Sequence, residues 1–215
     1  MKAQVVSPIG RGLTWGLADG RELPHIFVIA GPNGAGKSTT APMLLRHHFG
    51  VFDYVNADTI AAGLSAFAPE RAAMQAGRIM LRELHRLQAK HVDFAFETTL
   101  STRSYLPWLV KCRNDGYQIS LLFIALSSPE VATARVAERV RNGGHGIPEH
   151  VIRRRYCRGL GNFFTLYQPV LDRWFLVDNS LAALPTIVAY GGTGIAPAVL
   201  RADLYALLEE RYAKR

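Results

Sequence analysis

A nine-residue segment at 31–39 has the residue types and the spacing of a phosphate-binding loop. It reads Gly-Pro-Asn-Gly-Ala-Gly-Lys-Ser-Thr, which fits the pattern Gly-x-x-x-x-Gly-Lys-Ser/Thr, and it follows an apolar run at 26–30 that predicts a buried strand. Glycines let successive backbone N–H groups face one anion, and the helix after the loop adds its positive N-terminal end. These features together predict a nucleotide-binding loop rather than an ordinary glycine turn.

In this pattern the lysine reaches the β- and γ-phosphates, and the serine hydroxyl can ligate Mg²⁺. We therefore expect ATP and Mg²⁺ as cofactors, with Lys37 acting in catalysis and Ser38 binding the metal. The residues expected to bind ATP are Gly31, Pro32, Asn33, Gly34, Ala35, Gly36, Lys37, Ser38 and Thr39.

The composition indicates one globular α/β domain. The chain has 215 residues, of which 49% are hydrophobic and 20% are charged. Its two cysteines, Cys112 and Cys157, suggest neither a disulfide framework nor a zinc site. No apolar run is long enough to cross a membrane, and the N-terminus has no signal-peptide core, so we expect a cytoplasmic protein without membrane partners.

The positive charge is concentrated in one segment. The net charge is +8, and the segment 135–158 holds seven arginines against two glutamates. Positive charge spread over a surface would favour a nucleic-acid partner. Here the charge is concentrated in one arginine-rich segment beside a phosphate loop, which favours a clamp on a triphosphate and makes a nucleic-acid partner unlikely. The alternative for any one of these arginines is a solvated helix face.

Apolar strands alternate with helices along most of the chain, which predicts a mainly parallel sheet. We expect a three-layer α/β kinase fold with a phosphate loop, helices on both faces of the sheet, and a small helical, arginine-rich lid at about 135–158. Residues 1–24 are expected to form an N-terminal arm and residues 25–215 a single kinase domain. A loop is expected at 61–69, a last strand at 186–189 and a C-terminal helix at about 196–213.

The carboxyl ends of parallel strands meet at one edge of the sheet, where ligands bind. The phosphate loop, Asp58 and Glu97 each follow a predicted strand. Transporter-type ATPases and GTPases would need signature motifs that this chain lacks, which leaves a small-molecule kinase. In that class Asp58 would face the acceptor hydroxyl, its alternative role being a helix N-cap. Glu97 would serve Mg²⁺ or substrate, or form a structural ion pair.

Four motifs in order resemble the zeta toxin family, the kinases of bacterial toxin–antitoxin systems. These are the phosphate loop, the segment 55–58 (Val-Asn-Ala-Asp), the segment 96–101 (Phe-Glu-Thr-Thr-Leu-Ser) and the run 143–149 (Gly-Gly-His-Gly-Ile-Pro-Glu). The resemblance extends from about Phe27 to Ser180.

The resemblance implies ATP-dependent phosphorylation of a UDP-sugar such as UDP-N-acetylglucosamine. Asp58 matches the catalytic base, and Arg139 matches a lid arginine that neutralises the transferring phosphoryl group. The resemblance also implies a small antitoxin protein as partner. The residues expected at the acceptor are Asp58, Glu97, Thr98 and Thr99, and those of the lid clamp are Arg139, Arg141, His145 and Arg154.

The chain departs from the family pattern at two positions. His145 stands where the family has a second lid arginine, and a histidine is only partly charged near neutral pH, so Arg141, Arg154 or Arg155 would take this role instead. Ser101 stands where better-known members carry arginine.

Three alternatives follow from the same residues. The acceptor could be another small metabolite or a polynucleotide end, or nucleotide binding could merely switch an interaction surface. A further hypothesis is that the N-terminal arm replaces an antitoxin in cis.

Overall fold

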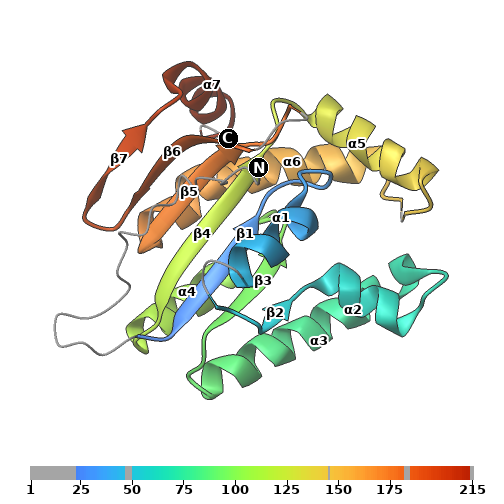
Figure 1. The fold of residues 1–215 in the computed structure, drawn as a ribbon, viewed down its shortest axis with the longest axis horizontal. Helices are drawn as coiled ribbons and strands as arrows, with labels where there is room; N and C mark the ends of the chain where they lie inside the picture. The colour runs from blue at the N-terminus through green and yellow to red at the C-terminus, as the bar shows by residue number, and fades with distance from the viewer. Residues whose placement is uncertain (1–22, 47–49, 145, 182–184, 214–215) are drawn as a thin grey trace, which may run out of the picture.

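The computed structural model describes residues 23–46, 50–144, 146–181 and 185–213 (Figure 1). Nearly all of the arm expected at 1–24 and the lid residue His145 lie outside the described residues. Within the described part of the chain, no helix combines the length and the apolar character that a membrane crossing requires.

One seven-stranded sheet, in the order β2-β3-β1-β4-β5-β6-β7, forms the centre of the fold. The first five strands run parallel, and β6 and β7 are added antiparallel at one edge. The strands are β1 (His25–Ala30), β2 (Tyr54–Val55), β3 (Phe94–Thr98), β4 (Gln118–Ala125), β5 (Arg173–Asp178), β6 (Thr186–Gly192) and β7 (Ile195–Val199). All six residues of β1 are buried, as expected for a central strand covered on both faces.

Helices cover both faces of the sheet, with α1 on one face and α4 and α6 on the other (Figure 1). The helices are α1 (Lys37–Leu44), α2 (Ala57–Leu64), α3 (Pro69–Ala89), α4 (Tyr105–Asn114), α5 (Pro129–Arg141), α6 (Glu149–Asn162) and α7 (Ala202–Tyr212). The predicted three-layer α/β class with a mainly parallel sheet is confirmed, and α5 and α6 form the helical pair expected as the arginine-rich lid.

Two element predictions were wrong. The loop expected at 61–69 begins only after Leu64, because α2 starts directly after β2 with Asn56 as its N-cap. Residues 195–199, expected at the start of the C-terminal helix, form β7 instead, and the helix begins at Ala202. Gly194 has a φ of 72°, a conformation that favours glycine, and it turns the chain back so that β7 pairs with β6.

His25 is buried where β1 pairs with β4. Its backbone N–H donates to the carboxylate of Asp93 at 2.8 Å, and its ring Nε2 lies 3.0 Å from Ser120 Oγ. Burial, and secondarily the positive charge of Arg173, lowers the pKa of His25 from 6.5 to about 4. The folded protein therefore binds this proton less readily than the unfolded chain does.

We expect stability to fall as the pH is lowered from about 6.5 to about 4, because protonation of His25 then favours the unfolded chain. The loss should reach about 3 kcal/mol and should stop growing below pH 4, where the folded state is protonated as well. Urea unfolding across this pH range measures it, and His25→Gln should remove this part of the profile. His150→Gln, which replaces an exposed histidine, is the control and should retain it; identical profiles for the two variants would contradict the assignment.

Candidate active site

The segment 31–39 lies between β1 and α1 and adopts a conformation that requires glycine at three positions. Gly31, Gly34 and Gly36 have φ angles of 141°, 78° and 83°, a region that residues with a side chain rarely adopt. A Cβ atom at Gly31 would lie 2.2 Å from the carbonyl oxygen of Ile124. The loop is thus wrapped closely against the end of β4, with its backbone free to present N–H groups to an anion.

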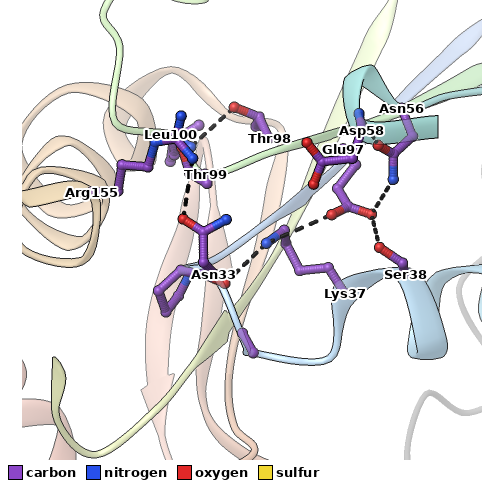
Figure 2. Close-up of polar contacts among 12 residues, drawn as sticks. Asn33, Lys37, Ser38, Asn56, Asp58, Glu97, Thr98, Thr99, Leu100 and Arg155 are labelled. Atoms are coloured by element: carbon purple, nitrogen blue, oxygen red, sulfur yellow. Dashed lines mark hydrogen bonds and ion pairs between the residues drawn. The ribbon is translucent and has the colours of Figure 1, made fainter. Parts of the chain in front are cut away.

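Side chains from distant elements attach this loop to the rest of the fold. Asn179, just after β5, donates from Nδ2 to the carbonyl oxygen of Ala35 at 2.9 Å. On the other side, Nη1 of Arg155 in α6 donates to Oδ1 of Asn33 at 3.3 Å (Figure 2). The loop is therefore held between β5 and α6.

Lys37 is almost fully enclosed, with 6% of its side chain exposed. Its Nζ donates to the carbonyl oxygen of Pro32 at 2.9 Å and lies 3.6 Å from Oε1 of Glu97. Burial lowers the pKa of Lys37, and the carboxylates of Glu97 and Asp58 oppose this shift. A buried ammonium is suited to binding phosphate oxygens.

Glu97, near the end of β3, accepts hydrogen bonds from three side chains on two segments of the chain. Its Oε2 accepts hydrogen bonds from Ser38 Oγ at 2.8 Å, Tyr54 Oη at 2.5 Å and Asn56 Nδ2 at 2.8 Å. Figure 2 shows Ser38 and Asn56 converging on this carboxylate. Burial, and then the charge of Glu97, raises the pKa of Tyr54, so the phenol stays protonated and donates.

This arrangement fits a magnesium site. The hydroxyl of Ser38 donates its proton to Glu97 and keeps lone pairs that can face a cation. A phosphate-loop serine together with a carboxylate at a neighbouring strand end is the oxygen set that holds Mg²⁺ in nucleotide hydrolases and kinases of this loop class. Glu97 also lies 3.6 Å from Lys37 Nζ, so its part in metal binding stays a prediction beside the structural ion pair.

Asp58 lies in the first turn of α2 and does not cap that helix. The cap is Asn56, whose Oδ1 accepts from the backbone N–H groups of Asp58 at 2.8 Å and Thr59 at 3.3 Å. The carboxylate of Asp58 is therefore not consumed by capping. Because β3 lies between β2 and β1 in the sheet, Glu97 stands between Asp58 and the phosphate loop.

A cavity of about 290 Å³ opens beside Asp58. Arg139 from α5 and Arg155 from α6 line it opposite α2 and α3, so the structure brings Asp58 and Arg139 together as predicted. The remaining lining residues are small and apolar: Ala57, Ala61, Ala62, Pro69 and Ala73. A carboxylate and two guanidinium groups around an apolar floor can bind and orient a polar acceptor.

Thr98 is the last residue of β3, and Thr99 begins the turn that follows. Thr98 Oγ1 accepts from the backbone N–H of Leu100 at 3.0 Å, and Thr99 Oγ1 lies 2.9 Å from Ser101 Oγ. Asn162 of α6 fixes the turn by donating to the carbonyl oxygen of Leu100 at 2.8 Å. Both threonines are near Glu97, as predicted, and their part in acceptor binding stays a prediction.

The arginines of the segment 135–158 are not equivalent. Arg153 links the two lid helices through Glu130 at 2.5 Å and Glu149 at 2.7 Å. Arg141 and Arg154 are exposed, and neither lines the cavity beside Asp58. Their expected clamp role stays a prediction, and that of His145 concerns a residue outside the described part.

The sequence analysis assigned no role to Tyr54 or Asn56, and it named Arg155 only as an alternative lid arginine. Tyr54 and Asn56 precede Asp58 in the same short segment, and parallel pairing of β2 with β3 could have pointed to them, because it brings both strand ends beside Glu97. The contact of Arg155 with the phosphate loop has no local signal, because Asn33 lies 122 positions away in the chain.

The fold and the loop geometry define a kinase-like domain with a phosphate loop. Residues 26–156 match the family model AAA_33, an AAA domain, and this chain belongs to that family. A relative from Haemophilus influenzae is 31% identical over 126 residues, which cover 59% of this chain and 88% of that protein.

Solved structures support the same fold. A chain of the AvrRxo1-ORF1:-ORF2 complex with ATP superimposes with a TM-score of 0.69 at 18% identity and covers 89% of this chain. This chain spans only 64% of that protein. A structure of the PezAT toxin–antitoxin system of Streptococcus pneumoniae has a TM-score of 0.58 at 16% identity, covering 74% of this chain and 69% of its own. At these identities the likeness establishes the fold.

We expect Tyr54→Phe to weaken magnesium-dependent ATP turnover by about 10- to 100-fold, because Glu97 loses one of the donors that orient it. Titration of ATP hydrolysis with Mg²⁺ should show a higher half-saturating concentration. Tyr190→Phe, which removes a partly exposed phenol on β6, should behave as the wild type. Unchanged Mg²⁺ dependence in Tyr54→Phe would show that the phenol does not position the carboxylate.

Proposed function

We propose that the protein is an ATP-dependent phosphotransferase related to the zeta toxins, which moves the γ-phosphate of ATP to a hydroxyl of a small acceptor. The observation that carries the proposal is the cavity in which Asp58 of α2 faces Arg139 of α5, next to the phosphate loop with its buried Lys37. A base and an arginine at one cavity, with a phosphate-loop lysine nearby, are parts that phosphoryl transfer uses.

In this mechanism the backbone of the loop and Lys37 hold the β- and γ-phosphates. Ser38 and Glu97 would hold Mg²⁺, with Glu97 acting directly or through water, and the ion would supply neutralisation of the phosphate charge. Asp58 orients the acceptor hydroxyl. The acceptor oxygen bonds to the γ-phosphorus while the bond to the bridging oxygen breaks, ADP leaves with the electron pair, and Asp58 accepts the hydroxyl proton. Arg139 stabilises charge on the equatorial oxygens.

We expect Asp58→Asn to remove phosphoryl transfer while leaving ATP affinity within about threefold of the wild type. The amide keeps the shape of the carboxylate and cannot accept the proton, and such bases typically contribute about 10²- to 10⁴-fold in rate. Acceptor phosphorylation and titration with a non-hydrolysable ATP analogue measure the two effects. Asp203→Asn, at the exposed start of α7, is a matched control. Retention of most of the turnover by Asp58→Asn would contradict the base assignment.

For the acceptor, the proposal names a UDP-sugar such as UDP-N-acetylglucosamine, on the strength of the zeta toxin motifs. A second candidate is a smaller metabolite, such as a monosaccharide. The cavity volume of about 290 Å³ favours it, because this lies at the lower end of the range for small-molecule sites.

Mass spectrometry after incubation with Mg-ATP distinguishes these acceptors. We expect an added phosphate on one member of a panel of UDP-sugars, and no product with the Asp58→Asn variant. A phosphate on a free monosaccharide instead would support the smaller acceptor. Salt-sensitive binding to RNA without ATP, together with phosphate on its 5′ end, would support a polynucleotide kinase. ATP binding without any phosphorylated product would indicate a nucleotide-dependent switch. A protein partner that suppresses ATP binding would agree with an antitoxin.

A further inference from the structure

Helix α6 carries three consecutive arginines, and their side chains have different surroundings. Neighbouring helix residues are about 100° apart around the axis, so they cannot share one face. Arg153 is bound by Glu130 and Glu149, and Arg154 is exposed to solvent. Arg155 is half-buried and reaches over the phosphate loop, where its Nη1 donates to Oδ1 of Asn33 (Figure 2).

The position of Asn33 places this guanidinium at the phosphate end of the loop. Asn33 is buried and follows Pro32, whose carbonyl oxygen accepts the hydrogen bond from Lys37 Nζ at 2.9 Å. The lysine ammonium and the arginine guanidinium are thus held by adjacent residues of one loop. Lys37 is the group that meets the β- and γ-phosphates in such loops, so Arg155 stands beside the same phosphates.

Arg155 also faces the acceptor side. It lines the cavity of about 290 Å³ together with Asp58 and Arg139. One guanidinium is therefore shared between the loop that would hold the donor and the cavity that would hold the acceptor. The transferring phosphoryl group has to pass between these two places.

The helix that carries Arg155 is firmly seated. The next residue, Tyr156, is fully buried and donates its hydroxyl to the carbonyl oxygen of Leu126 at 2.5 Å. One turn later the backbone of Gly159 lies so close to the turn after β3 that a Cβ there would be 2.5 Å from the carbonyl oxygen of Thr99. A side chain on such a helix keeps its place before the nucleotide arrives, and preorganised charge is what stabilises a transition state efficiently.

We propose that Arg155 is a catalytic residue that contacts the transferring phosphoryl group, and that Asn33 positions its guanidinium before ATP binds. This rests on the proposed phosphotransferase function. As the acceptor oxygen bonds to the γ-phosphorus and the bridging oxygen leaves with ADP, Arg155 donates hydrogen bonds to the equatorial oxygens. It exchanges the oxygen of Asn33 for phosphate oxygens, and it serves only as a hydrogen-bond donor. Its planar fork can bind two oxygens at once, which a lysine ammonium cannot reproduce.

The test compares arginine variants on the same helix. Arg155→Ala should lower kcat for Mg-ATP turnover by about 10³-fold or more, and Arg155→Lys by about 10²-fold, with the affinity for a non-hydrolysable ATP analogue changed less than about tenfold. Arg153→Lys is the matched control and should keep kcat within about threefold, because Arg153 pairs with the exposed carboxylates of Glu130 and Glu149 and does not line the cavity. Circular dichroism checks that each variant is folded.

Two further measurements separate a catalytic role from a structural one. Added guanidinium ion should raise the kcat of Arg155→Ala at least about tenfold, because the free ion can occupy the place that the side chain vacated beside the phosphates. It should not raise the kcat of Asp58→Asn. Asn33→Ala should lower kcat about tenfold in the wild-type background and should have no added effect in Arg155→Ala, since the two side chains act as one unit.

The outcomes are distinct. If the wild type turns over ATP and Arg155→Ala retains its kcat, the assignment of Arg155 is wrong and the phosphotransferase function stands. A loss without guanidinium rescue, or an additive effect of Asn33→Ala, would also overturn it in favour of a structural role. If the wild-type protein binds Mg-ATP and turns none over, the proposed function itself fails, and the role of Arg155 fails with it.

Discussion

The carboxylate of Glu97 is the group on which the geometry of the site depends. A buried charge is costly unless it is paired and hydrogen-bonded. Glu97 satisfies this requirement with three donors from separate elements and with the ammonium of Lys37 at 3.6 Å. Since Asn56 both donates to Glu97 and caps α2, the start of that helix, and with it the place of Asp58, is set by the same carboxylate.

The order of the strands explains why one residue can do this. The strands β2, β3 and β1 are neighbours and run parallel, so their carboxyl ends lie side by side. Asp58 follows β2, Glu97 is the next-to-last residue of β3, and the phosphate loop follows β1. The proposed base and the proposed donor site thus stand on either side of Glu97, and their spacing is determined by the sheet.

The sequence reasoning succeeded where a local pattern has a single structural solution. The loop at 31–39 needs glycines with positive φ between a strand and a helix, and it lies there. The parallel sheet followed from apolar runs that alternate with helices. Prediction failed where pairing decides the structure: β7 contains Pro197 and exposed residues, and it is a strand because Gly194 folds it back along β6. Likewise, no periodicity reveals that Tyr54 donates to Glu97 or that Arg155 reaches Asn33.

The basic segment shows why net charge alone is a poor guide to partners. The excess of arginines at 135–158 is by itself compatible with a nucleic-acid surface. The positions of the individual guanidinium groups show which of them have partners within the fold. Arg153 joins α5 to α6 through two glutamates, and Arg135 donates to the carbonyl oxygen of Ser180 at 3.0 Å. These two guanidinium groups are used within the fold.

The two arginines of the cavity differ in how they are held. Arg155 is fixed by Asn33 and by a helix packed on the end of the sheet. Arg139 is exposed near the end of α5, and the glycine pair that follows it includes Gly143, with a φ of 84°. Gly144 lies so close to Arg139 that a Cβ there would be 2.6 Å from its Cγ. A residue larger than glycine at position 144 would have to displace the stem or the backbone of Arg139, so the close approach of the chain to Arg139 depends on Gly144.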